Sequence, residues 1–227
     1  MEIESLFLDS KWNILTELSH SSLSPTELAI KTKTSIANIS AQLRLLEALD
    51  FIEKEKLGNI MKGQPRRLYS LKKDFAYLVL GSKSVIGKKL LKLDNEAMPF
   101  FSVWLINDST APYVLIKFFL DNEQLLKDAS SLGYLGIRGD ELEVIIIHPI
   151  PANLQVLQEK QVVKNDKVYK IRAHVHSKDD IETGISKKDE YFTSILRKVF
   201  IVFDRDNTLS KLKKGGKCTS WLGLLKP

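Results

Sequence analysis

Two pairs of side chains have the spacing needed to share an ion. Glu141 and Glu143 stand two residues apart in a predicted strand, as do His174 and His176 in another. Alternate side chains of a strand point to the same face. Paired carboxylates could hold Mg²⁺ for phosphoryl transfer, and paired imidazoles could bind one metal ion. No third ligand lies close to the histidines in sequence, so we predict that they lie on a solvated strand face, with metal binding as the alternative. For the chain as a whole we predict no metal, cofactor or catalytic residue.

Cations gather around a predicted β-turn. In MKGQPRRLYSL, the turn-forming Gly63-Gln64-Pro65 lies between Lys62 and Arg66-Arg67. A turn requires particular backbone angles but no charge, so turn chemistry does not account for the cations. Between residues 53 and 92 the chain carries 11 basic and 3 acidic residues. This cluster predicts an anionic partner.

The composition is that of a globular protein with an uneven charge. The chain has 227 residues, 44% hydrophobic and 27% charged, and a net charge of +6. Residues 1–92 hold 15 Lys+Arg against 10 Asp+Glu, and residues 93–227 hold 19 against 18. The excess positive charge therefore lies in the first two-fifths of the chain, and the length allows two modest domains.

Cysteine content and apolar runs indicate the compartment. Cys218 is the single cysteine, which excludes an intrachain disulfide and a cysteine-based zinc site. The start, MEIESLFLDSKWN, is acidic where a signal peptide would be basic, and runs such as Val144–Ile147 are too short to cross a bilayer. We expect a soluble, cytoplasmic protein with no membrane partner.

Three helices and a hairpin are predicted over the first 75 residues. Ser10 can cap a first helix, and Ser24-Pro25-Thr26-Glu27 combines an N-cap, a first-turn proline and a capping box. A third helix is predicted over 35–49 and a hairpin over 51–71. The residues expected to face inward are Trp12, Ile14, Leu15, Leu18, Leu28, Ala29, Ile30, Ile36, Ile39, Leu43, Leu45, Leu46 and Leu49.

This order resembles the winged helix-turn-helix of prokaryotic, especially archaeal, transcription regulators of the ArsR and MarR type. The resemblance covers about a third of the chain and rests on the opening SPTELA, the helix ISAQLRLL, the exit LDFIE and the wing ending RRLYSL. It implies a DNA-binding domain over residues 1–75, with helix 35–49 in the major groove and the basic wing 57–68 on phosphates or the minor groove.

The outward side chains of the third helix would then read bases, because Asn and Gln pair with adenine and Arg with guanine. These residues are Ser35, Ala37, Asn38, Ser40, Ala41, Gln42 and Arg44. Around them, phosphate or wing contacts are predicted for Lys31, Lys33, Lys54, Lys56, Lys62, Gln64, Arg66 and Arg67. For any one of these residues, a solvated surface position is the alternative.

Residues 76–98 are predicted as a connecting helix, which in the resembling families often mediates dimerisation. Packing against the first domain is the equal alternative. Residues 99–210 predict a mixed α/β sandwich domain, with a strand buried on both faces at Ile145–Ile147 and a helix over 189–197. Residues 211–227 are predicted as a flexible basic tail.

The second domain faintly resembles a minimal nucleotidyltransferase in the order of its segments, with Glu141 and Glu143 at the paired-carboxylate position. Gly136-Ile137 replaces the family's Gly-Ser, and a third carboxylate is missing from strand 168–176. The resemblance therefore implies a degenerate domain without catalysis.

The sequence thus predicts an α+β protein that binds double-stranded DNA and regulates transcription as a homodimer. Its C-terminal domain would sense a small-molecule or protein effector or mediate assembly. The alternatives are a nucleotidyltransferase-like enzyme targeted by a winged helix, and a winged-helix module that binds proteins.

Overall fold

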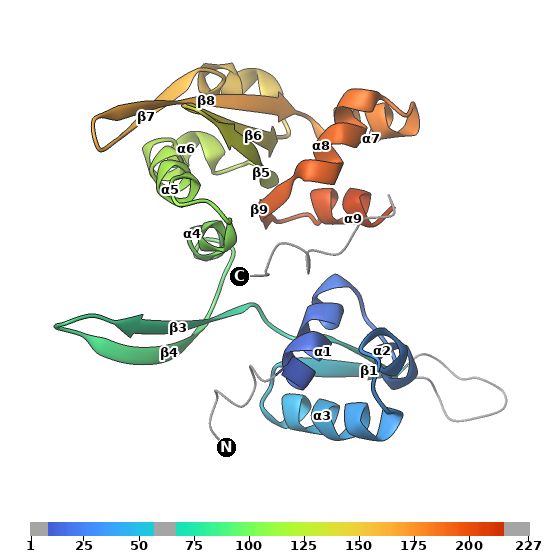
Figure 1. Ribbon diagram of the computed structural model, residues 1–227. Coiled ribbons are helices and arrows are strands. Elements are labelled where there is room, and N and C mark those ends of the chain that lie inside the picture. Colours follow the sequence, from blue (N-terminus) through green and yellow to red (C-terminus); the bar gives the residue numbers. More distant parts are fainter. Residues whose placement is uncertain (1–8, 57–66, 216–227) are drawn as a thin grey trace. The chain divides into compact units, whose positions relative to one another are not determined.

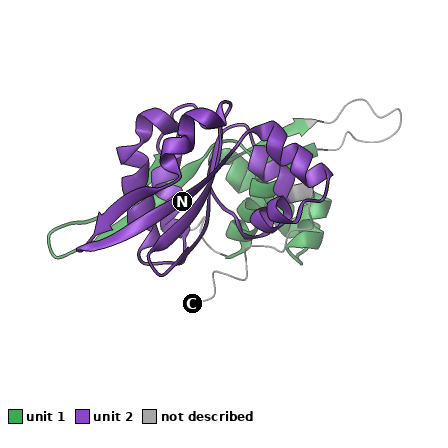
Figure 2. Cartoon of the chain, turned by 90° about the horizontal axis from the view of Figure 1, so that it is seen from above, with its two compact units in different colours: residues 1–93 green, residues 94–227 purple. Residues whose placement is uncertain are grey.

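The computed structural model describes residues 9–56 and 67–215, which fall into two compact units (Figure 2). The first unit is Met1–Leu93 and the second is Asp94–Pro227. Both contain helices and strands (Figure 1), so the predicted mixture of α and β structure is confirmed. None of the described helices has the length and apolar character that a bilayer span requires.

Three helices and a two-stranded sheet begin the first unit. They are α1 (Asp9–His20), α2 (Pro25–Lys31), α3 (Ile36–Ala48) and the antiparallel pair β1 (Ile52–Lys56) and β2 (Arg67–Leu71). The predicted capping box of α2 is present. The Ser24 N–H donates to Glu27 Oε2 at 2.8 Å, and the Glu27 N–H donates to Ser24 Oγ at 3.4 Å. These bonds satisfy two backbone groups that the first turn leaves without partners.

The core of this unit lies where the helices meet β1 and β2. Ile14, Leu28, Ile39, Leu43 and Leu46 are at most 1% exposed, and each such burial contributes about 1.5–3 kcal/mol. The prediction was wrong for the outer side chains, because Ile30 is 73% and Ile36 52% exposed, and Trp12 and Leu45 are exposed as well. Only the inner stripe of these helices is buried in the core.

The predicted helix over 76–98 was wrong, because this segment is a β-hairpin. Strands β3 (Phe75–Gly81) and β4 (Ile86–Lys92) pair antiparallel. Ser82 closes the turn by donating its N–H to the Val85 carbonyl at 2.8 Å and accepting the Val85 N–H on its hydroxyl at 2.9 Å. The aromatic and β-branched residues of the segment and its interrupting glycines favour strands over a helix.

The hairpin is anchored at one end and exposed at the other. The Phe75 ring meets the Phe51 ring edge-on, with 4.8 Å between centroids, and Leu90 packs on the same core. Towards the turn, Val79 is 68% and Ile86 88% exposed. The hairpin base therefore belongs to the core of the first unit, and its tip does not.

The second unit is built on a five-stranded sheet in the order β7-β8-β6-β5-β9. Its strands are β5 (Ser131–Arg138), β6 (Glu141–Ile147), β7 (Lys160–Lys164), β8 (Lys167–His176) and β9 (Phe200–Asp204). β6 and β8 run parallel, and the other neighbours are antiparallel. The helical elements are α4 (Met98–Ser102), η2 (Val103–Leu105), α5 (Ala111–Asp121), α6 (Glu123–Leu126), η3 (Pro151–Leu157), α7 (Lys178–Ser186), α8 (Glu190–Lys198) and α9 (Thr208–Gly215).

Helices lie on both faces of this sheet (Figure 1). On one face, Val144 and Ile146 of β6 pack with Phe118 of α5. On the other, Ile145 and Ile147 pack with residues of α7, α8 and α9. The prediction of a strand buried on both faces is confirmed for β6, which places its glutamates beside a helix-covered surface.

Two predictions for the C-terminal part need correction. Part of the predicted flexible tail, 211–215, belongs to α9, whose Leu209 is fully buried against the sheet. Strand β7 and helix α7 were not predicted. α7 packs closely on α8, because a Cβ added to Gly184 would lie 2.1 Å from Phe192 Cδ2.

Candidate nucleic-acid interface and polar cleft

The outer face of α3 carries small residues and one cation. Ala37, Ala41 and Arg44 are exposed, and Ser40 is half-buried among them. They lie away from Ile39, which is fully buried in the core. Small residues let a helix approach a surface closely, while Arg44 makes no side-chain hydrogen bond or ion pair within the described residues. This part of the predicted recognition set is available to a partner.

Asn38 and Gln42 are less available. Asn38 Nδ2 donates to Thr34 Oγ1 at 3.0 Å, and Gln42 Nε2 donates to Asn38 Oδ1 at 3.3 Å. The three side chains form a row spaced four residues apart, and Gln42 Oε1 is buried without a partner among the described residues. Both amides are half-buried, so the prediction that they read bases needs them to leave this row first.

Ser35 has a structural task. It is the N-cap of α3, and its hydroxyl accepts the Asn38 N–H at 3.2 Å. An N-cap hydroxyl that satisfies a first-turn N–H typically contributes about 1 kcal/mol to helix stability. Ser35 thus fixes where α3 begins, and its hydroxyl retains one hydrogen to donate.

Of the lysines predicted to bind phosphates, some are held in ion pairs and others are not. Lys31 forms an ion pair with Glu17 at 2.8 Å, and Lys54 forms one with Glu47. Lys33 is exposed in the turn between α2 and α3, with a left-handed φ of 54°. Exposed ion pairs are weak, about 0–1 kcal/mol, so phosphates could replace these partners at small cost.

Much of the predicted wing lies outside the described residues, namely Lys62, Gln64 and Arg66. Arg67 opens β2 with an exposed side chain and stands opposite Lys56 in the β1–β2 register. The structure therefore places two cationic residues opposite each other, where β1 ends and β2 begins.

Asp50 joins the end of α3 to the end of β2. Its carboxylate accepts hydrogen bonds from Lys72 and from Lys73, the latter at 3.2 Å. These bonds, that from Lys72 foremost, lower the pKa of Asp50. The contact is exposed, so it helps to position β2 relative to α3 without adding much stability.

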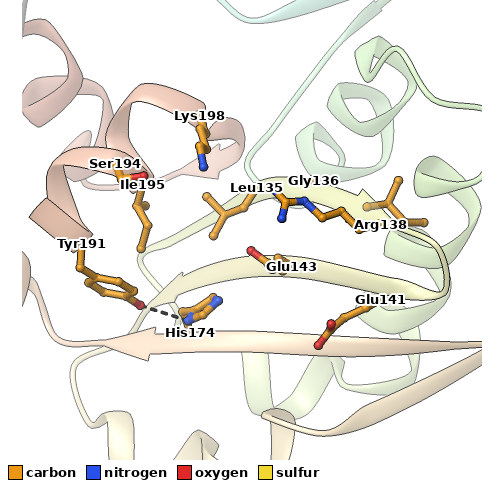
Figure 3. Close-up of a pocket in the computed structure, with 11 residues that line it drawn as sticks. Leu135, Gly136, Arg138, Glu141, Glu143, His174, Tyr191, Ser194, Ile195 and Lys198 are labelled. Carbon is orange, nitrogen blue, oxygen red and sulfur yellow. Dashed lines mark hydrogen bonds between the residues drawn. The ribbon is translucent and has the colours of Figure 1, made fainter.

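A cleft of about 270 Å³ lies in the second unit between α8 and the β5–β6 hairpin (Figure 3). β5 pairs with β9 only as far as Tyr134–Phe200, yet continues to Arg138. A bulge between Tyr134 and Gly136, where Gly136 has φ 145°, turns the strand at this point. Residues other than glycine rarely adopt that φ, so glycine is required, and the bulged part of β5 lines the cleft.

Tyr191 of α8 joins two histidines of β8. Its hydroxyl lies 3.1 Å from His174 Nδ1 and 2.9 Å from His176 Nε2. Burial lowers the pKa of both histidines, although Glu143 acts against this at His174 and Asp180 at His176. Burial also raises the pKa of Tyr191. At neutral pH the three groups are therefore uncharged, and the hydroxyl can donate to one imidazole and accept from the other.

The two glutamates differ. Glu141 forms an ion pair with Arg172 Nε at 2.6 Å, and Figure 3 shows its carboxylate turned away from that of Glu143. The Glu143 carboxylate is half-buried in the cleft and has no hydrogen bond or ion pair within the described residues. No group of three or more His, Cys, Asp or Glu side chains in the described part of the chain could hold a metal ion. A carboxylate-chelated metal is not supported by this arrangement.

Sequence reasoning missed the other cleft residues: Leu135, Arg138, Tyr191, Ser194, Ile195 and Lys198. The signal was present, because Tyr191, Ser194, Ile195 and Lys198 have the spacing of one helix face. The segment was predicted as a helix, but nothing local showed that this face would stand over the β5–β6 hairpin.

Comparison of the chain with protein-family models gave no match, and comparison with curated proteins also gave none.

Proposed function

We propose that the first unit is a winged helix-turn-helix that binds double-stranded DNA and that the protein regulates transcription. Support comes from the order of α1, α2, α3, β1 and β2, with a capped α2 and a tight turn before α3. In such domains the second helix of the motif lies in the major groove. α3 takes that role, and β1–β2 with the segment between them takes the role of the wing.

The observation that carries the proposal is the outer face of α3. Ala37, Ala41 and Arg44 are exposed together on a helix whose opposite face is fixed in the core. Arg44 can form paired hydrogen bonds with guanine, and the two alanines allow close approach to base edges. Ser40, Lys33 and Arg67 add contacts at the edge, where phosphates set affinity and register.

The proposal includes a homodimer, because helix-turn-helix regulators commonly place two copies on half-sites one helical turn apart. It also assigns the second unit to effector sensing or assembly. Sedimentation of the free protein and of its DNA complex measures the number of copies. Two copies on one fragment are expected, and a single copy at saturation contradicts the dimer.

Mobility shifts with genomic fragments test DNA binding. Arg44→Ala should lower the affinity for the preferred fragment by about tenfold or more, since one good base contact is worth about 1–3 kcal/mol. The matched control is Arg197→Ala, which removes an exposed arginine of α8. Equal binding by wild type and Arg44→Ala, or no binding at all, contradicts the proposal.

A further inference from the structure

We propose that the cleft between α8 and the β5–β6 hairpin binds a small zwitterion of the α-amino acid type. The ammonium group would pair with Glu143, and the carboxylate with Lys198 and Arg138. This inference concerns the second unit alone and does not depend on DNA binding by the first.

The charges facing the cleft lack partners. Glu143, Lys198 and Arg138 all line the cleft, and none of them forms an ion pair or side-chain hydrogen bond within the described residues. Figure 3 shows the charged ends of these three side chains turned into the same space. The opposite charges are too far apart to pair with each other, which leaves a gap between them for a ligand of both signs.

Of the three charged groups, the Glu143 carboxylate is the one that most needs a partner of opposite charge. It is half-buried, and Arg172, which lies opposite Glu143 in the β6–β8 register, pairs with Glu141 instead. The neighbours Glu141 and His174 cannot neutralise the Glu143 carboxylate. Glu141 is itself an anion held by Arg172, and burial keeps the pKa of His174 below its usual value. A partly buried carboxylate without a partner costs free energy that a bound ammonium group would recover.

The balance of charge selects against other ligands. A polyphosphate would meet Lys198 and Arg138 favourably, but it would also be repelled by Glu143. A polyamine would pair with Glu143 but would be repelled by the two cations. A zwitterion satisfies both sides, and discrimination by opposed charges is a general source of ligand specificity.

The remaining lining suits the body of an amino acid. Leu135 of β5 and Ile195 of α8 provide apolar contact, and the Ser194 hydroxyl can donate or accept a hydrogen bond. The volume, about 270 Å³, lies below the usual range for drug-sized ligands. Tyr191, fixed by two histidines, closes one end of the cleft with an oriented ring.

Calorimetric titration of the full chain with each proteinogenic L-amino acid, at neutral pH, tests the inference. At least one amino acid should bind, while its N-acetyl derivative and its amide, which each lack one charge, should bind at least about tenfold more weakly. Equal binding of either derivative, or binding by no amino acid, overturns the inference. These comparisons need no variant, so a folding defect cannot confuse them.

Variants then locate the site. Glu143→Gln and Lys198→Met should each lower the affinity for the amino acid by about tenfold or more. Matched changes at Glu182 of α7 and at Lys187, the residue that follows this helix, should leave the affinity unchanged as Glu182→Gln and Lys187→Met. If the site variants bind as tightly as wild type, or if ATP with Mg²⁺ competes for the cleft and binds more tightly than any amino acid, the inference is wrong. DNA binding is not measured here, so failure of the proposed function leaves this result interpretable.

Discussion

The polar side chains on the surface of α3 and those of the cleft differ in their partners. Asn38 and Gln42 bond along a row within α3, and Ser35 caps the helix. Glu143 and Lys198 of the cleft have no such partners within the described residues. Polar groups bonded to one another stabilise a helix surface, whereas convergent groups without partners favour a ligand. In the first unit, fewer polar side chains are therefore available to a ligand than the spacing of residues suggested. In the second unit, more of them are available.

Gly184→Ala should have the largest effect, and it should affect the cleft without affecting the surface of α3. The added Cβ would lie 2.1 Å from the Phe192 ring, so α8 must move, at a cost of about 1–3 kcal/mol in unfolding free energy. Binding in the cleft should be lost while DNA binding persists. Thermal unfolding and titrations measure this. The control Gly87→Ala places its Cβ in open space. Loss of DNA binding in Gly184→Ala would show that the two sites are not separate.

Substitutions at Gln42 examine the row on α3. Gln42→Leu removes a buried oxygen without a partner, so stability should stay constant or rise by up to about 1 kcal/mol. Gln42→Glu places a charge in the same position and should destabilise the unit by about 1–3 kcal/mol. Chemical denaturation of both variants decides between these outcomes. A strongly destabilised Gln42→Leu would mean that the bond to Asn38 matters more than the buried oxygen.

Lys33→Gly should change stability and DNA affinity in opposite directions. Lys33 has a left-handed φ of 54°, which glycine adopts without strain, so stability should rise by about 1 kcal/mol. The same change removes a cation, so DNA affinity should fall modestly on all fragments alike. Denaturation and mobility shifts on the same preparation measure both effects. A change in sequence preference would contradict a phosphate-only role.

The smallest expected effect is the pH dependence of the second unit. Because burial lowers the pKa of His174 and His176, the unfolded chain binds protons at a higher pH than the folded chain. Stability from these groups is present above the ordinary histidine pKa of about 6.5 and is lost as the pH falls through their lower folded values. Nearby Glu143, Glu141 and Asp180 oppose the shift, and Arg172 adds to it at His174.

Denaturation of the wild type and of His174→Gln with His176→Gln, at several pH values, measures this dependence. The double variant should show a flatter profile between neutral and acidic pH. An identical profile in both proteins would assign the pH dependence to other groups.

Local signals were readable from the sequence. The capping box at Ser24 and Glu27 was predicted because its bonds span three residues, and β6 was predicted because its run of β-branched residues has few alternatives. A helix was predicted over residues 76–98 because an apolar run with a basic end fits both the helical and the strand period. Gly81 and Gly87, and the serine-rich turn between them, were the signals for a hairpin.

Tertiary partners could not be read in this way. The spacing in α3 marks Asn38 and Gln42 as outward, yet the bonds between their amides depend on rotamers that the sequence does not reveal. The cleft needs β5, β6, β8 and α8 brought together from distant segments, and the bulge at Gly136 lies in its lining. Arg172 lies opposite Glu143 in the parallel register of β6 and β8 but pairs diagonally with Glu141, and sequence spacing alone fixes neither the register nor this choice of partner.

The most direct test of the central claim, DNA binding by the outer face of α3, is the salt dependence of fluorescence anisotropy on a labelled genomic fragment. The logarithm of the wild-type association constant should fall linearly with the logarithm of salt concentration. Arg67→Ala should reduce this slope by about one unit, since it removes a phosphate contact. Arg44→Ala should lower the affinity for the preferred fragment more than the affinity for an unrelated one. A wild-type affinity that does not change with salt, or an Arg44→Ala variant that binds both fragments as wild type does, would contradict the claim.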